Sequence, residues 1–409
     1  MKLPRASVAM ALGSAVSLAA QALFSLLMLR AFTPEAVGSF AAIAQVAFFW
    51  MTLALAQSPL RLLADAHVPL AQARRQALRG TSMRLLALLP LAALATLMGG
   101  APLAASLAWA GLLALLQAGW YIAQPVALRT GRPAYAACAR ALPPLCALLV
   151  AAATAWRLAD AGTPVLLASA AAGYAVGCLW LVHVGNNTPT EIAPPRLAHP
   201  LQRDSRSSTL RLLHTAADAA TGAALLLVWQ RVHGAAEAGL LAVLLRLLGM
   251  VPVVVHTAWA QVLLAQGRRW HGSPLWAGAA GAGLTGVVAM ACAVLLSRGW
   301  LPAWEAALPY VLPLTLWQAA ACMHAACSHL PFQQGRAKTF SQAAIAFSGV
   351  QCLVLVAPPL LGAEPTPLQH AWALGTASCA GLLLWSAWIV RTCREPALAA
   401  DAPNQSGQT

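Results

Sequence analysis

Charged side chains are scarce in this sequence, and acidic ones are the scarcest. Asp and Glu together number 11 in 409 residues, and charged residues of both signs make up 9% of the chain. Hydrophobic residues make up 60%, and the mean hydropathy is +0.69. Soluble domains contain about 25% charged residues, so this composition excludes an ordinary soluble globular protein.

Signatures of catalysis and nucleotide binding are also missing. The sequence has no GxxxxGK[ST] loop to hold ATP phosphates, so we expect coupling to an ion gradient, of H⁺ or Na⁺, rather than to ATP. It has no paired carboxylates, and the connections predicted on the outer side are short. These absences argue against a membrane enzyme such as a glycan polymerase or ligase, and we predict that the protein is not an enzyme.

Disulfide and metal chemistry are not expected either. The nine cysteines fall inside apolar runs or at their inner ends, which does not suit a disulfide framework. Cys322, His324, Cys327 and His329 resemble a metal cluster in spacing. On a helix, Cys322 shares a face with His329 while the other two lie elsewhere, so the four ligands cannot converge. We predict no metal and no cofactor.

Long apolar runs recur along nearly the whole chain, and each is long enough to cross about 30 Å of hydrocarbon. They predict an all-α polytopic membrane protein of about 12 transmembrane helices in two six-helix lobes. The predicted spans are 7–29, 38–57, 85–101, 103–124, 139–156, 163–184, 210–230, 239–264, 274–296, 303–327, 340–361 and 368–390.

The basic residues are distributed with a strong bias between the two sides of the membrane. If both termini are cytoplasmic, four arginines (Arg30, Arg157, Arg231 and Arg298) lie outside, Arg246 lies within the membrane, and the other 20 of the 25 Lys and Arg residues lie inside. This bias satisfies the positive-inside rule. The charge is spread over many segments, so nucleic acid is not an expected partner. The Ala- and Arg-rich composition favours a bacterial inner membrane.

The chain divides near its longest polar connection, and its halves are similar. We predict a six-helix lobe over 1–184, a cytoplasmic linker over 185–208, a second lobe over 209–394 and a disordered tail over 395–409. A shift of 201 positions places Arg30 on Arg231 and Gly38 on Gly239, and it also places Ser17 on Asp218 and Gln45 on Arg246. These matches indicate a parallel internal repeat.

Ionisable side chains inside the predicted spans are the candidate functional residues, because each costs about 2.5–3.5 kcal/mol at the bilayer centre. Arg211, His214 and Asp218 share one face of the span that begins at 210, and Arg246 and His256 lie on the next span. Asp218 and Arg246 differ in depth by about 10 Å at the helical rise, so a direct ion pair between them is not expected.

Two interpretations of these residues remain open. In the structural one, Asp218 pairs with His214 or Arg211, and Arg246 extends to the membrane surface. In the functional one, they line a hydrated cavity between the lobes that attracts an anionic headgroup. Ser14, Ser17 and Gln21 form a polar stripe that suits either close helix packing or a cavity wall, and Gln45 would add a hydrogen-bonding group for sugars.

Two hairpins carry a resemblance to a known family. Leu26-Leu-Met-Leu-Arg-Ala-Phe-Thr-Pro-Glu-Ala-Val-Gly-Ser-Phe-Ala-Ala42, followed by Gln57-Ser-Pro-Leu-Arg61, resembles the opening of the polysaccharide transporters. These are lipid-linked oligosaccharide flippases of the multidrug/oligosaccharidyl-lipid/polysaccharide exporter superfamily. Ala238-Gly-Leu-Leu-Ala-Val-Leu-Leu-Arg246 resembles the start of their second half. The resemblance implies a MATE-like V of two lobes around a cationic cavity.

The resemblance also implies a cargo, namely glycan linked to undecaprenyl diphosphate or a related polyprenyl carrier. The predicted substrate-binding residues are Arg246, Arg211, His214, Asp218, His256, Gln45, Gln21 and Ser17. The predicted partners are the polyprenyl-linked glycan, membrane lipids and other proteins of glycan assembly. The alternative from the same superfamily is a multidrug or cation exporter, which should have carboxylates in its first lobe; the first six predicted spans contain none.

Overall fold

The computed structural model describes residues 5–64, 68–100, 102–130, 133–157, 162–186, 205–266 and 274–393. Within these ranges the regular structure is entirely helical. The helices are α1 (Arg5–Ala31), α2 (Pro34–Leu55), α3 (Ser58–Ala64), α4 (Leu70–Ala87), α5 (Leu89–Met98), α6 (Leu103–Arg129), α7 (Pro133–Arg157), α8 (Thr163–Asn186), α9 (Ser205–His233), α10 (Ala235–Gln266), α11 (Pro274–Ser297), the 3₁₀-helix η2 (Pro302–Tyr310), α12 (Val311–Cys327), α13 (Leu330–Gln333), α14 (Ala337–Leu360) and α15 (Pro367–Thr392).

The predicted fold class and the number of spans are confirmed. Among the described residues, 11 helical segments are long and apolar enough to cross a membrane, and the bent pair α4 and α5 makes a twelfth if it is counted as one span. The predicted tail over 395–409 and most of the predicted linker over 185–208 lie outside the described residues.

The third span differs from its prediction as a straight helix over 85–101. Helix α4 starts at Leu70, and α5 follows after a bend of 52°. Pro90 lies in the first turn of α5, where it has no N–H with which to continue the preceding helix. The buried side chains of α4 are Ala73, Ala77, Thr81 and Leu85, and the helix packs on α2 and α6. The arginine-rich stretch is therefore a packed part of the bundle.

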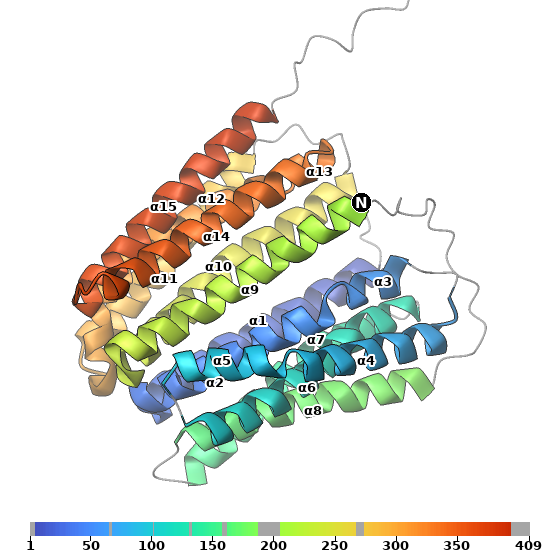
Figure 1. Cartoon of the computed structure of the whole chain (residues 1–409), viewed down its shortest axis with the longest axis horizontal. Helices are drawn as coiled ribbons and strands as arrows, with labels where there is room; N and C mark the ends of the chain where they lie inside the picture. Colours follow the sequence, from blue (N-terminus) through green and yellow to red (C-terminus); the bar gives the residue numbers. More distant parts are fainter. Residues whose placement is uncertain are drawn as a thin grey trace, which may run out of the picture.

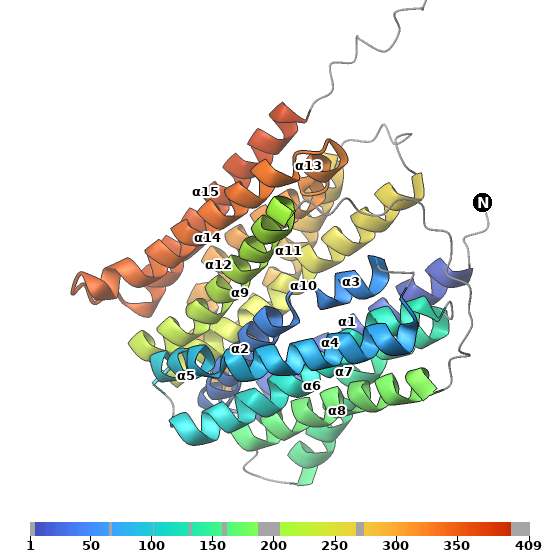
Figure 2. The ribbon, with the colours of Figure 1, turned by 45° about the vertical axis from the view of Figure 1, so that its right-hand side comes forward.

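The helices form two groups that correspond to the two halves of the sequence (Figure 1). In the first group α1 packs on α7, α6 on α8 and α2 on α6; in the second α9 packs on α14, α12 on α15 and α11 on α12. The groups meet through α2 against α9 and α10. They come together at the end where α1 turns into α2, and they diverge toward the end where α1 begins (Figures 1 and 2).

The closest approach of the two groups is a crossing of α2 and α10 at two glycines. A Cβ added to Gly38 would overlap the carbonyl oxygen of Ala235, and one added to Gly239 would overlap the carbonyl oxygen of Pro34. Pro34 and Ala235 are themselves 201 positions apart, as are the two glycines, so the contact is self-complementary about a pseudo-twofold axis. Glycine at both positions lets the backbones touch.

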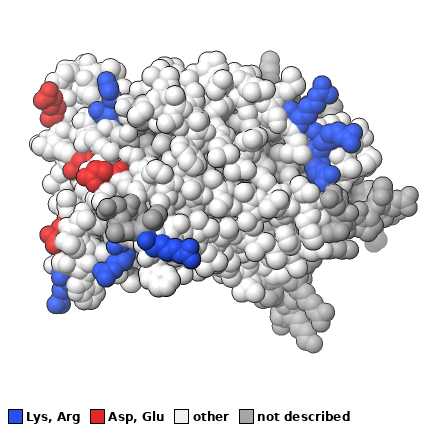
Figure 3. Space-filling view, turned by 90° about the horizontal axis from the view of Figure 1, so that it is seen from below, with Lys and Arg blue, Asp and Glu red and all other residues white. Residues whose placement is uncertain are grey.

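On the face shown in Figure 3, charged residues lie toward the two ends of the bundle, with an uncharged band between them. Apart from Asp218, the described Asp and Glu residues lie at the end where the two groups meet; they are Glu35, Glu237, Glu305 and Glu364. The white band is what a membrane-spanning protein presents to the hydrocarbon core. Asp218 is therefore unusual in its place along the bundle.

Candidate functional site

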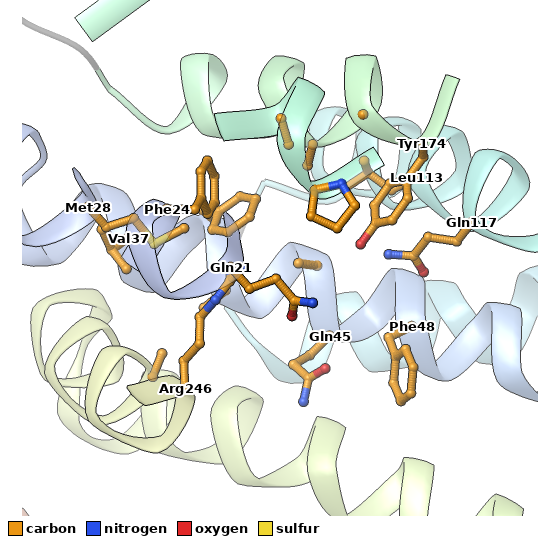
Figure 4. A pocket seen from close by; sticks show the side chains of 18 of the residues that line it. Gln21, Phe24, Met28, Val37, Gln45, Phe48, Leu113, Gln117, Tyr174 and Arg246 are labelled. Carbon is orange, nitrogen blue, oxygen red and sulfur yellow. The ribbon is translucent and has the colours of Figure 1, made fainter. Parts of the chain in front are cut away.

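A cavity of about 570 Å³ lies in the first lobe and is closed on one side by α9 and α10 of the second. This volume falls within the range of about 300–1,000 Å³ typical of sites for small molecules. Much of its wall is aromatic, contributed by Phe24, Phe40, Phe48, Trp120, Tyr121 and Tyr174. Figure 4 shows the polar side chains that interrupt this wall, including Gln21, Gln45, Gln117 and Arg246.

Three glutamines supply most of the neutral hydrogen-bonding groups of the cavity. Gln21 Nε2 donates to Ser17 Oγ at 3.2 Å within α1. Gln45 Nε2 donates to the carbonyl oxygen of Gly222 at 3.1 Å, which joins α2 of the first lobe to α9 of the second. Gln117 is buried, and its Oε1 has no hydrogen-bond partner among the described residues. The amide oxygen of Gln117 is thus a buried acceptor without a described donor beside the cavity.

Arg246 provides the only charge among the described residues that line this cavity. Its side chain extends from α10 toward α1, and its Cζ atom lies 5.1 Å from the centre of the Phe24 ring (Figure 4). Such a contact with a ring face stabilises a cation by about 0.5–2 kcal/mol. Arg246 is half-buried and has no ion pair or hydrogen bond with the described residues. A guanidinium with five N–H donors therefore faces the cavity without an acceptor among the described residues.

The proline pair of α7 shapes the opposite wall. Pro143 and Pro144 line the cavity, and Pro143 has no N–H to give to the carbonyl of Ala139, four residues earlier. Trp120 Nε1 donates to that carbonyl at 2.6 Å instead. Gly173 of α8 packs so closely on this bend that an added Cβ would lie 2.5 Å from the Pro143 carbonyl oxygen. One indole thus satisfies a backbone group that the proline leaves without its helical partner.

This replacement of a helical hydrogen bond gives a stability prediction. Trp120→Phe should lower the free energy of unfolding in both the native background and a Pro143→Ala background. The loss should be about 1 kcal/mol larger in the native background, because there the Ala139 carbonyl is left without a hydrogen bond. In the second background the new alanine supplies a backbone N–H to the Ala139 carbonyl. Thermal unfolding of the four purified proteins in detergent measures the difference. An equal loss in both backgrounds would show that only packing of the indole matters.

Asp218 lies in a different, smaller cavity. This second cavity, of about 200 Å³, is lined by Asp218, Thr221, Trp317 and Gln351 among others. Asp218 Oδ2 lies 3.9 Å from His214 Nε2, and Asp218 Oδ1 accepts a hydrogen bond from Ser348 Oγ at 3.5 Å. Its side chain is 70% exposed. Within the described residues, the carboxylate pairs with His214 and not with Arg246.

The structure brings only some of the predicted site residues together. Arg246, Gln45 and Gln21 line the larger cavity, and Ser17 is buried directly behind Gln21. Asp218 lines the smaller cavity and pairs with His214, while Arg211 is exposed near the start of α9. His256 stacks on His329, with ring centroids 4.5 Å apart, and lines neither cavity. The predicted set is therefore divided among four places.

Residues that the sequence analysis did not single out complete the larger cavity. Tyr174 lies beside Gln117 (Figure 4), and Trp120 supports the wall as described. Tyr174 was a detectable candidate, because the chain has only four tyrosines and this one occurs in the middle of an apolar run. The aromatic rings of α1, α2 and α6 gave no such signal, since aromatic residues in membrane helices are ordinarily part of the packing.

Comparisons by sequence find no relative: no protein-family model matches the chain, and no curated protein matches it. Comparison by structure, in contrast, finds similar proteins. The lipid II flippase MurJ in an inward closed conformation matches with a TM-score of 0.60 and 14% identity, over 94% of this chain and 87% of MurJ. The fold is that of the MATE and MurJ transporters.

Two MATE proteins support the same conclusion. The multidrug transporter DinF-BH, solved in complex with a ligand, has a TM-score of 0.55 at 13% identity over 94% of each chain. An inward-facing multidrug resistance MATE transporter of the MOP superfamily has a TM-score of 0.53 at 11% identity over 97% of each chain. At these identities the comparison establishes the shared fold, and the cargo has to be argued from the cavities.

Proposed function

We propose that this protein is a flippase that carries a polyprenyl-diphosphate-linked oligosaccharide across the bacterial inner membrane for the synthesis of a surface polysaccharide. The observation that carries the proposal is Arg246, an arginine in the membrane-spanning part of the bundle that faces a cavity and has no acceptor among the described protein groups. A cation placed there at a cost of a few kcal/mol requires a compensating partner. A phosphate group supplies one, because its oxygens match the guanidinium fork.

The rest of the cavity suits the sugar part of such a cargo. The amides of Gln21, Gln45 and Gln117 exchange hydrogen bonds with hydroxyl groups, and the aromatic rings offer apolar faces on which sugar rings pack. The polyprenyl tail stays in the hydrocarbon of the bilayer throughout, so no free energy is spent on moving it into a polar environment. Membrane lipids and other proteins of glycan assembly are the partners that this role implies.

The contact between the lobes suggests how access alternates. With the basic end of the bundle facing the cytoplasm, the crossing of Gly38 and Gly239 closes the outer side in the state described here. Trp304 Nε1 of η2, which donates to the Phe32 carbonyl at 3.3 Å, adds to this closure. Rocking of the lobes about the seam breaks these contacts and the Gln45 bond to Gly222, and opens the cavity to the other side.

We place the coupling to an ion gradient at Asp218. It is the only described carboxylate away from the outer end, and it lines a cavity together with the oxygen-bearing side chains of Thr221 and Gln351. Asp218→Asn should therefore abolish the dependence of transport on an imposed H⁺ or Na⁺ gradient, and Glu364→Gln, at an exposed loop position, should retain it. The rate of lipid transport in proteoliposomes with and without each gradient tests this. An unchanged gradient dependence in the Asn variant would contradict the assignment.

Export of hydrophobic drugs is the second candidate function, and the aromatic cavity wall favours it. The match to the multidrug transporter DinF-BH is consistent with this alternative. Cationic drugs are disfavoured, because the described lining residues include a cation and no carboxylate. The two functions therefore differ in the charge of the preferred cargo: a flippase prefers the anionic diphosphate lipid, whereas an exporter of hydrophobic drugs does not.

The location of lipid-linked glycan in cells tests the proposed function. Cells that lack the protein should accumulate lipid-linked glycan on the cytoplasmic leaflet, and its outward-facing pool should fall. Restoring the native chain should restore that pool, whereas restoring an Arg246→Glu chain at equal membrane abundance should not. Equal amounts of outward-facing glycan with and without the protein would refute the function.

A further inference from the structure

A second arginine, Arg140 of α7, lies among the helices of the first lobe. It is half-buried and precedes the cavity-lining Pro143 by one helical turn. Its Nη1 donates to Ser14 Oγ of α1 at 2.9 Å, which is its only hydrogen bond to the described residues, and it has no ion pair with them. Most donors of this guanidinium, like those of Arg246, thus have no acceptor in the part of the protein that the structure describes.

The packing of α1 on α7 sets this geometry. A Cβ added to Gly13 would lie 2.7 Å from Ala137 Cα, so the glycine allows the two helices to approach closely one turn before Arg140. The arginine side chain is then directed along α1 and reaches Ser14. The packing of α1 on α7 therefore fixes where the Arg140 side chain lies.

One face of α1 connects the two arginines. Ser14, Ser17, Gln21 and Phe24 follow the spacing i, i+3, i+7 and i+10, so they form one stripe along the helix. Arg140 contacts the first of them and Arg246 the last. Ten residues separate Ser14 from Phe24, which corresponds to about 15 Å at a rise of 1.5 Å per residue. The polar stripe thus has an arginine from another helix at each end.

We propose that Arg140 forms a first binding station for the phosphate group of the cargo, nearer the basic end of the bundle than Arg246. This inference rests on the proposed function and adds a site to it. A diphosphate is too short to contact both arginines at once, so the headgroup binds first at Arg140 and then, past Gln21, at Arg246. Several weak sites in series allow entry and release, as in ion-conducting pores.

The competing explanation is that Arg140 only fastens α7 to α1 through Ser14. Two variants separate these roles. Ser14→Ala removes the fastening hydrogen bond and leaves the cation, whereas Arg140→Gln removes the cation and keeps a side chain that can bond Ser14. A fastening role predicts that Ser14→Ala loses stability, that Arg140→Gln keeps most of it, and that neither variant changes the affinity for cargo. A binding role predicts that only Arg140→Gln weakens the affinity.

Transport kinetics provide the first test. The probe is a fluorescent polyprenyl-diphosphate N-acetylglucosamine in proteoliposomes made from the full chain, with the initial rate measured against the probe's mole fraction. Arg140→Gln should raise the apparent KM about 10-fold, or about 1.4 kcal/mol, with little change in maximal rate. Ser14→Ala should change both values by less than about twofold. An unchanged KM in Arg140→Gln with active transport would overturn the station and leave the proposed function intact.

Stabilisation by the bound probe provides a second test that does not depend on transport, because a ligand that binds the folded state raises the melting temperature. In an Arg246→Gln background the probe should still raise it, and in the Arg140→Gln/Arg246→Gln double variant it should not. Equal shifts in the single and double variants would overturn the station.

Phosphatidylglycerol serves as a second ligand that distinguishes cargo from bilayer lipid. If it stabilises the Arg246→Gln chain as much as the probe does, Arg140 holds bilayer phospholipid and the proposal fails. Loss of transport with this binding pattern preserved would refute the flippase function alone.

Discussion

Replacing Arg246 with Gln is expected to reduce transport of a phosphate-bearing lipid by roughly 100-fold, while the amount of folded protein stays unchanged. Two charge-assisted hydrogen bonds to a phosphate contribute about 3 kcal/mol, which corresponds to that factor. Stability should fall by no more than about 0.5–2 kcal/mol, the contribution of the Phe24 ring contact, because the side chain has no ion pair or hydrogen bond to the described residues that the substitution would break. Initial rates in proteoliposomes measure the effect, and size-exclusion profiles report the folded fraction.

Two further variants define the cause of this loss. Arg298→Gln removes the same charge from an exposed position at the far end of α11 and should transport normally. Arg246→Lys keeps the charge but lacks the planar fork, so its rate should be intermediate. Normal rates in Arg246→Gln would mean that the arginine has no part in cargo binding, and equal losses in Arg298→Gln would point to an effect of net charge.

Gly38→Val is expected to block transport for a different reason. Its Cβ would overlap the carbonyl oxygen of Ala235, and neither backbone can move aside without separating α2 from α10. Overpacking of this kind costs about 1–3 kcal/mol or more, which is enough to shift a two-state equilibrium by roughly 5- to 100-fold. The variant should therefore populate states in which the outer ends of the lobes are apart.

Spin labels report this separation directly. Arg157 at the end of α7 and Arg298 after α11 are both exposed, and they belong to different lobes. Labels at these positions should show a longer distance in Gly38→Val and also in Gly239→Val. The matched control is Gly286→Val on α11, where an added Cβ meets no described atom within 4 Å. A native distance distribution in Gly38→Val would show that the crossing does not hold the outer side closed.

The sequence was most informative where a single helix decides the outcome. Apolar length alone predicted the spans, because crossing hydrocarbon requires a continuous apolar helix. It was misleading in the third span, where arginines spaced along α4 concealed a buried face of small side chains and Pro90 introduced a bend. The offset of 201 positions had a direct structural counterpart, since Gly38 and Gly239 meet at the seam.

The site was harder to predict, because helical periodicity gives the face of a residue but not the helix opposite it. Asp218 and Arg246 were grouped in one cavity because both are ionisable residues inside the predicted spans, yet they line separate cavities. Arg140 was counted among the cytoplasmic charges, since the sequence does not show that α7 begins at Pro133 and carries it into the bundle. Such relations between distant segments require the tertiary structure.

The central claim is that Arg246 holds the phosphate group of a lipid-linked glycan. The most direct measurement is native mass spectrometry of the purified protein with an equimolar mixture of a polyprenyl-diphosphate sugar and the matching neutral polyprenyl glycoside. The native chain should retain the diphosphate lipid preferentially, and Arg246→Gln should lose that preference. Equal retention of the two lipids by the native chain, or an undiminished preference in the variant, would contradict the claim.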